Sequence, residues 1–172
     1  MREPVTLTLA LADEAATHGA GAALAHALLA DAAAGLCVTL AGDLGAGKTT
    51  LVRGVLRALG VVGAVRSPTY TLLESYPVEG GAVHHLDWYR LGGVDDLEGL
   101  GFRELSGPGQ WIFVEWPQQV PGVAATADLA IALAYAGAAR SLEARALTPV
   151  GAAVLARWMA ESALDNVCRS II

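Results

Sequence analysis

The hydrophobic and polar positions along the chain follow two patterns, one typical of buried strands and the other of helices. Short continuous apolar runs, such as residues 36–41 and 111–114, predict buried strands. Apolar residues three and four positions apart, such as Leu51, Val55 and Leu59, predict a helix over residues 50–59. Because such strands and helices are interspersed along the chain, the pattern predicts an α/β fold.

Turn and capping residues between the apolar runs define the remaining elements. Gly60 and Gly63 end the helix over 50–59, and Asp13 is placed to cap an alanine-rich helix that extends to about residue 34. Pairs of apolar runs around glycine-containing turns predict two β-hairpins. The further expected elements are strands over 5–9, 69–76, 82–88, 128–136 and 141–147, a short helix with loops over 92–103, and a final helix from near 149 to about 161.

A glycine-rich turn joins the strand over 36–41 to the helix over 50–59. Residues 42–49 read Gly-Asp-Leu-Gly-Ala-Gly-Lys-Thr and match G-x-x-x-x-G-K-[S/T], the phosphate-binding loop, or P-loop. In this motif, backbone N–H groups surround the phosphates, the lysine reaches the β- and γ-phosphates, and the last hydroxyl meets Mg²⁺. Lys48 is the only lysine beside ten arginines, as expected where a compact ammonium fits and a planar guanidinium does not. The sequence therefore predicts a nucleoside-triphosphate site.

The glycine-rich loop and the mixture of hairpins with helices together predict the fold. We expect a P-loop NTPase-like, three-layer α/β sandwich with a mixed sheet that contains β-hairpins. The 172 residues contain no internal repeat and no linker, so we expect a single domain over residues 1–161. Residues 162–172 are expected to form a disordered C-terminal tail.

Composition and charge narrow the classes of function. Hydrophobic residues make up 54% of the chain because alanine is abundant, and His26 and Asp31 interrupt the longest apolar stretch, so we expect no membrane-spanning helix. The N-terminus lacks the form of a signal peptide, and the two cysteines lie far apart, so we expect a cytoplasmic protein. The net charge is −6 and the arginines are scattered, so any involvement with RNA is expected to depend on a partner.

Two acidic residues at the ends of apolar strands are candidates for metal binding and catalysis. Glu115 follows residues 111–114, as in a Walker B strand, and is expected to hold Mg²⁺ directly or through water. Asp87 closes the strand candidate over 82–88 and is expected to polarise water or to support the metal shell. Either acid is also consistent with an ordinary hydrogen-bonded carboxylate at a strand end.

Hydroxyl and imidazole side chains supply two further candidates. Residues 67–70, Ser-Pro-Thr-Tyr, are consistent with a segment that senses Mg²⁺ or the γ-phosphate, and equally with a turn that starts a strand. His84 and His85 are adjacent and point to opposite faces of a strand. We therefore expect one of them to be packed and the other to be exposed.

Four motifs in this order resemble the TsaE (YjeE) family, which comprises bacterial ATPases needed to make N6-threonylcarbamoyladenosine (t6A) at position 37 of tRNAs. The motifs are residues 42–50, 67–70, 85–90 (His-x-Asp-x-Tyr-Arg) and 114–117 (Val-Glu-Trp-Pro), and the resemblance covers roughly residues 5–150. It implies an ATPase that works with TsaB and TsaD, the pair that transfers the threonylcarbamoyl group. The family's role is to drive or reset the cycle by ATP hydrolysis, with tRNA contacted only through the complex.

The resemblance also implies roles for individual residues. Thr49 and Glu115 are the implied Mg²⁺ ligands, Asp87 is needed for turnover, and Thr69 is the switch residue. Lys48, Thr69, Asp87 and Glu115 form the implied catalytic set. The implied ATP contacts are Glu14, Leu44, Gly45, Ala46, Gly47, Lys48, Thr49, Thr50 and Arg140.

Three other functions are alternatives to an ATPase. A GTPase is the nearest alternative, but the Asn-Lys-x-Asp motif with which GTPases usually read guanine is impossible here. The only asparagine is Asn166 and the only lysine is Lys48. A small-molecule kinase would need a substrate pocket and usually an arginine-bearing lid, for which the chain leaves little room. A nucleotide-gated binding module with negligible turnover remains an alternative.

Overall fold

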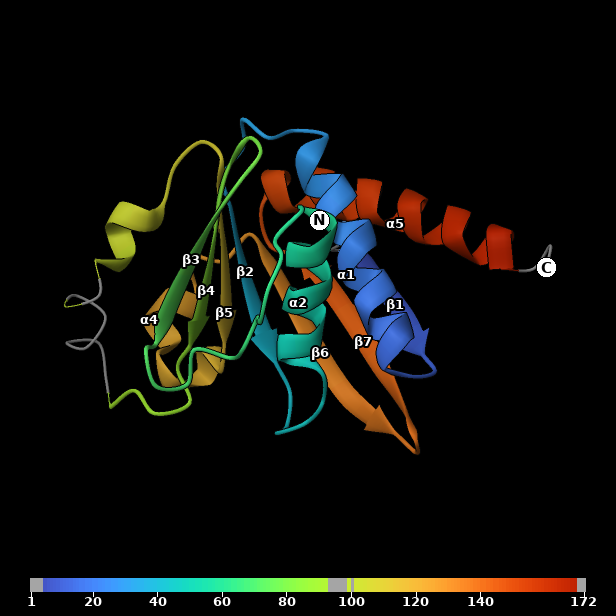
Figure 1. Ribbon diagram of the computed structural model, residues 1–172, viewed down its shortest axis with the longest axis horizontal. Coiled ribbons are helices and arrows are strands. Elements are labelled where there is room, and N and C mark those ends of the chain that lie inside the picture. The colour runs from blue at the N-terminus through green and yellow to red at the C-terminus, as the bar shows by residue number, and fades with distance from the viewer. Residues whose placement is uncertain (1–4, 93–98, 100, 170–172) are drawn as a thin grey trace.

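A mixed β-sheet forms the centre of the computed structural model, which describes residues 5–92, 99 and 101–169 (Figure 1). Within these residues the sheet has seven strands in the order β1-β7-β6-β2-β5-β4-β3. β2 pairs in parallel with β5 and β6, and β4 pairs in parallel with β5, whereas the two hairpins and the β1–β7 pair are antiparallel. The strands are β1 (Thr6–Leu11), β2 (Leu36–Ala41), β3 (Leu73–Val78), β4 (Gly81–Asp87), β5 (Gln110–Glu115), β6 (Leu129–Ala136) and β7 (Ala139–Ala146).

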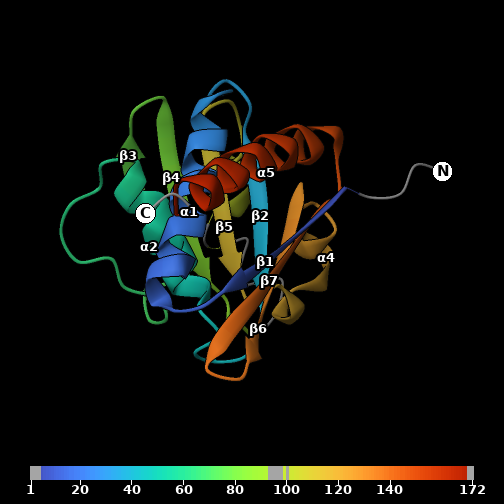
Figure 2. The ribbon, with the colours of Figure 1, turned by 90° about the vertical axis from the view of Figure 1, so that its right-hand side faces the viewer.

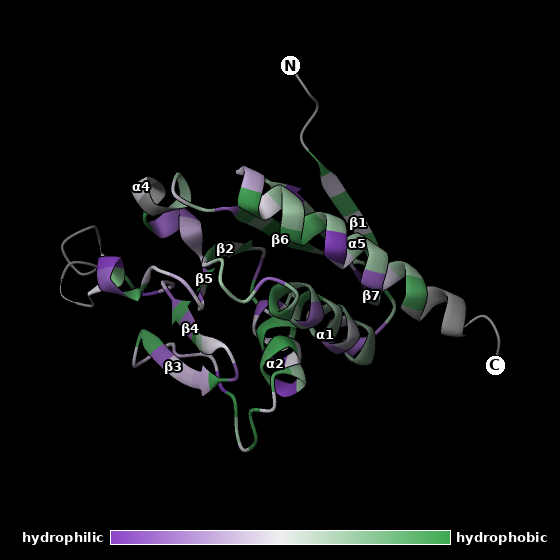
Figure 3. Ribbon diagram, turned by 90° about the horizontal axis from the view of Figure 1, so that it is seen from above, coloured by the Kyte–Doolittle hydropathy of each residue, from purple (hydrophilic) through white to green (hydrophobic). Residues whose placement is uncertain are grey.

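Helices cover both faces of the sheet, so the predicted three-layer α/β sandwich is confirmed (Figure 3). Along β5, Trp111 and Phe113 belong to one hydrophobic cluster and Ile112 and Val114 to a second, because successive side chains of a strand point to opposite faces. The larger cluster contains side chains from α1 (Glu14–Leu29), α2 (Lys48–Ala58) and α5 (Pro149–Arg169). The smaller cluster packs against η1 (Phe102–Leu105), which precedes β5, and against the segment after β5 that holds η2 (Pro117–Gln119) and α4 (Pro121–Ala124).

Several element boundaries differ from the expected ones. β3 begins at Leu73 rather than at residue 69, because the Leu72 N–H bonds to the Pro68 carbonyl in a turn, with Leu72 at a φ of 64°. α1 ends at Leu29 and not near residue 34. The expected helix over 92–103 lies largely outside the described residues, which contain η1 at its end.

The C-terminal segment is helical where a disordered tail was expected. α5 continues to Arg169, so the prediction of disorder from residue 162 onward is wrong up to that residue. The physical reason is that no glycine or proline follows Gly151, and residues of moderate or high helix propensity continue the helix. Figure 2 shows α5 crossing α1, where the Trp158 indole donates a 3.0 Å hydrogen bond to the Ala20 carbonyl.

No helix among the described residues combines the length and the apolar character that a membrane crossing requires.

Two glycines allow α1 and α2 to pack backbone against backbone. A Cβ on Gly21 would lie 2.3 Å from the Leu51 carbonyl oxygen, and one on Gly54 would lie 2.4 Å from the His18 carbonyl oxygen. Because α2 begins at Lys48 of the glycine-rich loop, this contact positions the loop against α1.

We predict that Gly54→Ala lowers stability although alanine favours a helix by about 1 kcal/mol. The added methyl meets backbone that cannot move aside, and overpacking of this kind costs about 1–3 kcal/mol. Urea and thermal unfolding should show a clear loss of stability. Gly122→Ala in α4 is the matched control, because a Cβ there meets nothing within 4 Å. Equal stability of the two variants would contradict the backbone contact.

Candidate functional site

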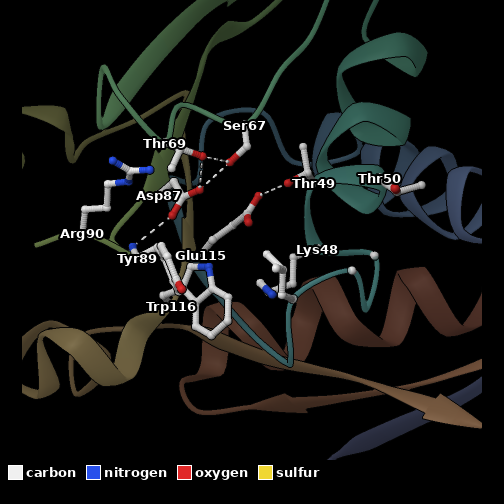
Figure 4. Close-up of a pocket in the computed structure, with 13 residues that line it drawn as sticks. Lys48, Thr49, Thr50, Ser67, Thr69, Asp87, Tyr89, Arg90, Glu115 and Trp116 are labelled. Carbon is white, nitrogen blue, oxygen red and sulfur yellow. Dashed lines mark hydrogen bonds between the residues drawn. The ribbon is translucent and has the colours of Figure 1, made fainter.

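The glycine-rich loop lies between β2 and α2 and leads into the N-terminus of α2 (Figure 4). Gly47 is the N-cap of α2 with a φ of 110°, and Gly42 has a φ of 143°. A Cβ on Gly42 would lie 2.3 Å from the Leu133 carbonyl oxygen, so both conformation and space require glycine there. Free N–H groups and the helix dipole make such a helix N-terminus suited to bind an anion.

The ammonium of Lys48 is held inside this loop. The side chain is 4% exposed, and its Nζ donates to the carbonyls of Gly42 (2.6 Å) and Asp43 (2.9 Å). It also lies 4.0 Å from the centroid of the Trp116 ring, a cation–π contact. Burial lowers the pKa of Lys48, and neighbouring carboxylates, Glu115 foremost, oppose that shift. The lysine thus presents its charge where the loop and β5 converge.

Thr49 and Glu115 meet at the end of β5. The family resemblance implies that these two residues are the Mg²⁺ ligands. The Thr49 hydroxyl donates a 2.7 Å hydrogen bond to Oε1 of Glu115, which is 3% exposed. Hydroxyl and carboxylate oxygens are the hard ligands that Mg²⁺ prefers. The described residues contain no cluster of three or more His, Cys, Asp and Glu side chains able to hold a metal. The pair is therefore compatible with a Mg²⁺ ion whose remaining ligands would be phosphate and water oxygens.

Asp87 lies beside Glu115, because these residues are register partners in the parallel β4–β5 pair. Its Oδ2 accepts hydrogen bonds from the hydroxyls of Ser67, at short range, and Thr69, at 3.0 Å. Its Oδ1 accepts from the Tyr89 N–H at 3.0 Å. The sequence predicted a water-polarising or metal-supporting acid. The structure adds a contact that sequence reasoning missed, since this carboxylate anchors the segment over 67–69.

These side chains line one cavity of about 350 Å³. Trp116 forms part of its wall with a positive φ of 59°, and the Tyr89 ring packs on the Trp116 indole with centroids 5.0 Å apart. Backbone strain in a residue other than glycine is common at functional sites. The lining residues are Leu44, Gly45, Gly47, Lys48, Thr49, Thr50, Ser67, Thr69, Asp87, Tyr89, Arg90, Glu115 and Trp116.

A second cavity of about 200 Å³ lies on the other side of the loop and brings together Glu14, Thr50 and Arg140. Arg140 donates to the Gly45 carbonyl at 3.4 Å, and Glu14 lies 3.7 Å from Arg53. Gly45, Ala46 and Gly47 line the cavity as well. All the predicted ATP-contacting residues therefore lie in or beside the loop, in one cavity or the other.

The tip of the β6–β7 hairpin holds the loop from outside. The Tyr135 hydroxyl donates a 2.8 Å hydrogen bond to the Leu44 carbonyl, and the Arg140 guanidinium lies 4.1 Å from the centroid of the Tyr135 ring. Sequence reasoning missed Tyr135, and no local signal could have found it, because its partner is 91 positions away.

Both adjacent histidines are buried, so the expectation that one is exposed is wrong. β4 is an interior strand between β3 and β5 and is covered on both faces, which leaves His84 7% and His85 0% exposed. His84 uses both ring nitrogens, with Ser75 at 2.8 Å and Gln110 at 2.7 Å. His85 contacts Oε1 of Glu115 through Nε2 at 2.8 Å.

Comparisons with known proteins agree on one family. The family model for the threonylcarbamoyl adenosine biosynthesis protein TsaE matches residues 11–143. A Haemophilus influenzae protein named tRNA threonylcarbamoyladenosine biosynthesis protein TsaE is 39% identical over 123 residues, 72% of this chain and 78% of that protein. A Streptomyces coelicolor protein of the same name is 48% identical over 48% of this chain and 57% of its own length.

The fold has a counterpart among solved structures. The crystal structure of Bacillus subtilis YdiB superposes with a TM-score of 0.73 and 23% sequence identity, covering 94% of this chain and 99% of that one. This likeness supports the α/β architecture described above.

We predict that Asp87→Ala releases the segment over 67–69, because the carboxylate accepts hydrogen bonds from both of its hydroxyls. Hydrogen exchange measured by mass spectrometry should be faster in peptides that cover this segment and unchanged in peptides from α1. Glu74→Ala is the control, since Glu74 accepts only an exposed bond from Thr71. Unchanged exchange in Asp87→Ala would show that other contacts order the segment.

Proposed function

This chain belongs to the TsaE family of tRNA threonylcarbamoyladenosine biosynthesis proteins, and we propose that it is the ATP-binding and ATP-hydrolysing component of that machinery. The observation that carries the proposal is the 2.7 Å contact between the Thr49 hydroxyl and Glu115 Oε1 at the N-terminus of α2. A P-loop hydroxyl that meets a strand-end carboxylate is the arrangement that phosphoryl transfer with Mg²⁺ requires. The buried ammonium of Lys48 lies at the same point.

The loop residues are assigned to the phosphates. N–H groups of residues 44–49 surround them, and Lys48 exchanges its bonds to the Gly42 and Asp43 carbonyls for bonds to phosphate oxygens. Thr49 and Glu115 are the residues that would hold Mg²⁺, and the ion would supply positive charge next to the phosphates. The cavity beside Glu14 and Arg140 is assigned to the rest of the nucleotide.

Asp87 and Thr69 are assigned to turnover. Asp87 holds the hydroxyls of Ser67 and Thr69 within the cavity where the γ-phosphate would lie. A segment tied to a carboxylate beside the metal site can change its order when the γ-phosphate binds or leaves. This coupling would report nucleotide state to partner proteins, for which we propose TsaB and TsaD, with tRNA contacted only through the complex.

The position of the arginine at the cavity supports slow ATP hydrolysis by the isolated protein. Arg90 lines the cavity, but its guanidinium lies 4.7 Å from the centroid of the exposed Tyr70 ring. In P-loop enzymes, an arginine that contacts the transferring phosphoryl group raises the hydrolysis rate by a factor of about 10³–10⁵. An arginine engaged elsewhere does not supply that charge. A nucleotide-gated binding module with negligible turnover is the second candidate function. An assay of phosphate release with and without partner proteins separates it from an ATPase.

We predict that Lys48→Ala lowers ATP affinity roughly tenfold to over a hundredfold, because a charge-assisted hydrogen bond contributes about 1.5–3 kcal/mol. Lys48→Arg should also impair hydrolysis, because a planar guanidinium does not reproduce the compact geometry in which the buried ammonium meets two loop carbonyls. Isothermal titration calorimetry and phosphate release measure the two effects. Normal hydrolysis by Lys48→Arg would contradict the assignment.

We predict that the two acids act differently. Glu115→Ala should weaken Mg²⁺-dependent ATP binding, whereas Asp87→Ala should mainly slow hydrolysis, because only Glu115 contacts the loop hydroxyl. Nucleotide titrations with Mg²⁺ and with EDTA test both variants. The same loss of metal dependence in both would show that the roles are divided wrongly.

We predict weak ATP hydrolysis by the pure protein and faster hydrolysis with TsaB and TsaD present. Phosphate release is measured for the protein alone, for the pair alone and for the three together, and ATP should be preferred to GTP. A gel shift with tRNA and the protein alone should show no tight binding, because the chain carries a net charge of −6. Full-speed turnover in isolation, or tight tRNA binding alone, would overturn the partner-dependent function.

A further inference from the structure

His85 is a buried polar side chain that contacts Glu115 of the candidate site. It lies on β4 opposite Phe113 of β5 in the parallel register, and it is fully buried. Its Nε2 lies 2.8 Å from Oε1 of Glu115, and within the described residues its Nδ1 has no hydrogen-bond partner. A side chain kept only for packing would not need this unpaired nitrogen, because a buried polar atom without a partner opposes folding.

The contact made by His85 converges with that of Thr49 on a single oxygen. Oε1 of Glu115 accepts from the Thr49 hydroxyl at 2.7 Å and lies 2.8 Å from the His85 Nε2. An ionised carboxylate offers about four lone-pair sites on two oxygens. Two donors on Oε1 fix the rotation of the carboxylate and direct Oε2 to a definite position beside the phosphate cavity, which Glu115 lines.

We propose that His85 is a positioning residue for the metal site, whose Nε2–H orients the Glu115 carboxylate for Mg²⁺-dependent nucleotide binding. This inference rests on the proposed function, in which Glu115 helps to hold Mg²⁺. The donor is present both in the neutral Nε2–H tautomer and in the imidazolium, so the role does not depend on the charge of the ring. Hydrogen-bond partners of metal-binding carboxylates commonly control metal affinity in this way.

The neighbouring histidine provides the contrast. His84 points to the other face of β4, where Ser75 and Gln110 satisfy both of its ring nitrogens. Neither of these partners lines the phosphate cavity, whereas the partner of His85, Glu115, does. The same strand therefore carries one histidine connected to the site and one connected only to the sheet, which gives a matched control.

The test compares His85→Leu, His85→Gln and His84→Leu with the unsubstituted protein. The affinity for a non-hydrolysable ATP analogue is measured by calorimetry, once with Mg²⁺ and once with EDTA, and thermal unfolding is measured without nucleotide. Mg²⁺ raises the affinity of the unsubstituted protein by a certain factor, and in His85→Leu this factor should be about 10–100-fold smaller. The affinity of His85→Leu in EDTA should be unchanged. His85→Gln, whose amide N–H can replace Nε2–H, should recover most of the gain, and His84→Leu should retain all of it.

The outcomes separate this inference from the function it rests on. If the unsubstituted protein binds the analogue equally well in Mg²⁺ and EDTA, the proposed metal site itself is wrong. If that protein depends on Mg²⁺ and His85→Leu depends on it equally, or if His85→Leu loses the same factor with Mg²⁺ and with EDTA, the positioning role is wrong.

A measurement on the unsubstituted protein covers the case in which His85→Leu does not fold. In ¹⁵N-histidine-labelled protein, NMR should show a protonated Nε2 for His85. That signal should shift when the analogue is added with Mg²⁺ and should remain in place when it is added with EDTA. An unprotonated Nε2, or the same shift under both conditions, would overturn the proposal.

Discussion

The parallel pairing of β5 between β2 and β4 is the constraint on which the site depends. This register sets Leu40, Glu115 and Asp87 side by side, at the point where β2 passes into the glycine-rich loop. Side chains alternate between the two faces of a strand, so a shift of one residue would turn Glu115 away from the loop and place Val114 there. Buried residues on both faces of β5 oppose such a shift.

The loop is held against these strand ends from two directions. Behind it, Gly21 and Gly54 let α1 and α2 meet at backbone distance, which fixes the axis of α2. In front of it, Tyr135 and Arg140 donate to the carbonyls of Leu44 and Gly45. Side chains at the hairpin tip therefore hold two of the loop carbonyls, which helps to fix the conformation of the loop.

Donors from the same chain surround both acids of the site. Asp87 and Glu115 are each less than 5% exposed, and both accept hydrogen bonds from hydroxyl groups. Buried charges need such partners, because isolated carboxylates are costly in an apolar interior. In this protein the hydroxyl donors come from the loop helix and from the segment over 67–69, the segments that would meet the phosphates. The interactions that stabilise the acids are therefore also those through which nucleotide would act on the fold.

The sequence by itself determined the parts of this protein that local chemistry governs. The glycine spacing around Lys48, the apolar run before Glu115 and the cap at Asp13 each lie within a few residues, and each was found where it was predicted. Only the tertiary structure decided the burial of His85, the role of Tyr135 and the hydroxyls bound to Asp87. Their partners lie 30, 91 and about 20 positions away, so only sheet register and packing bring them together.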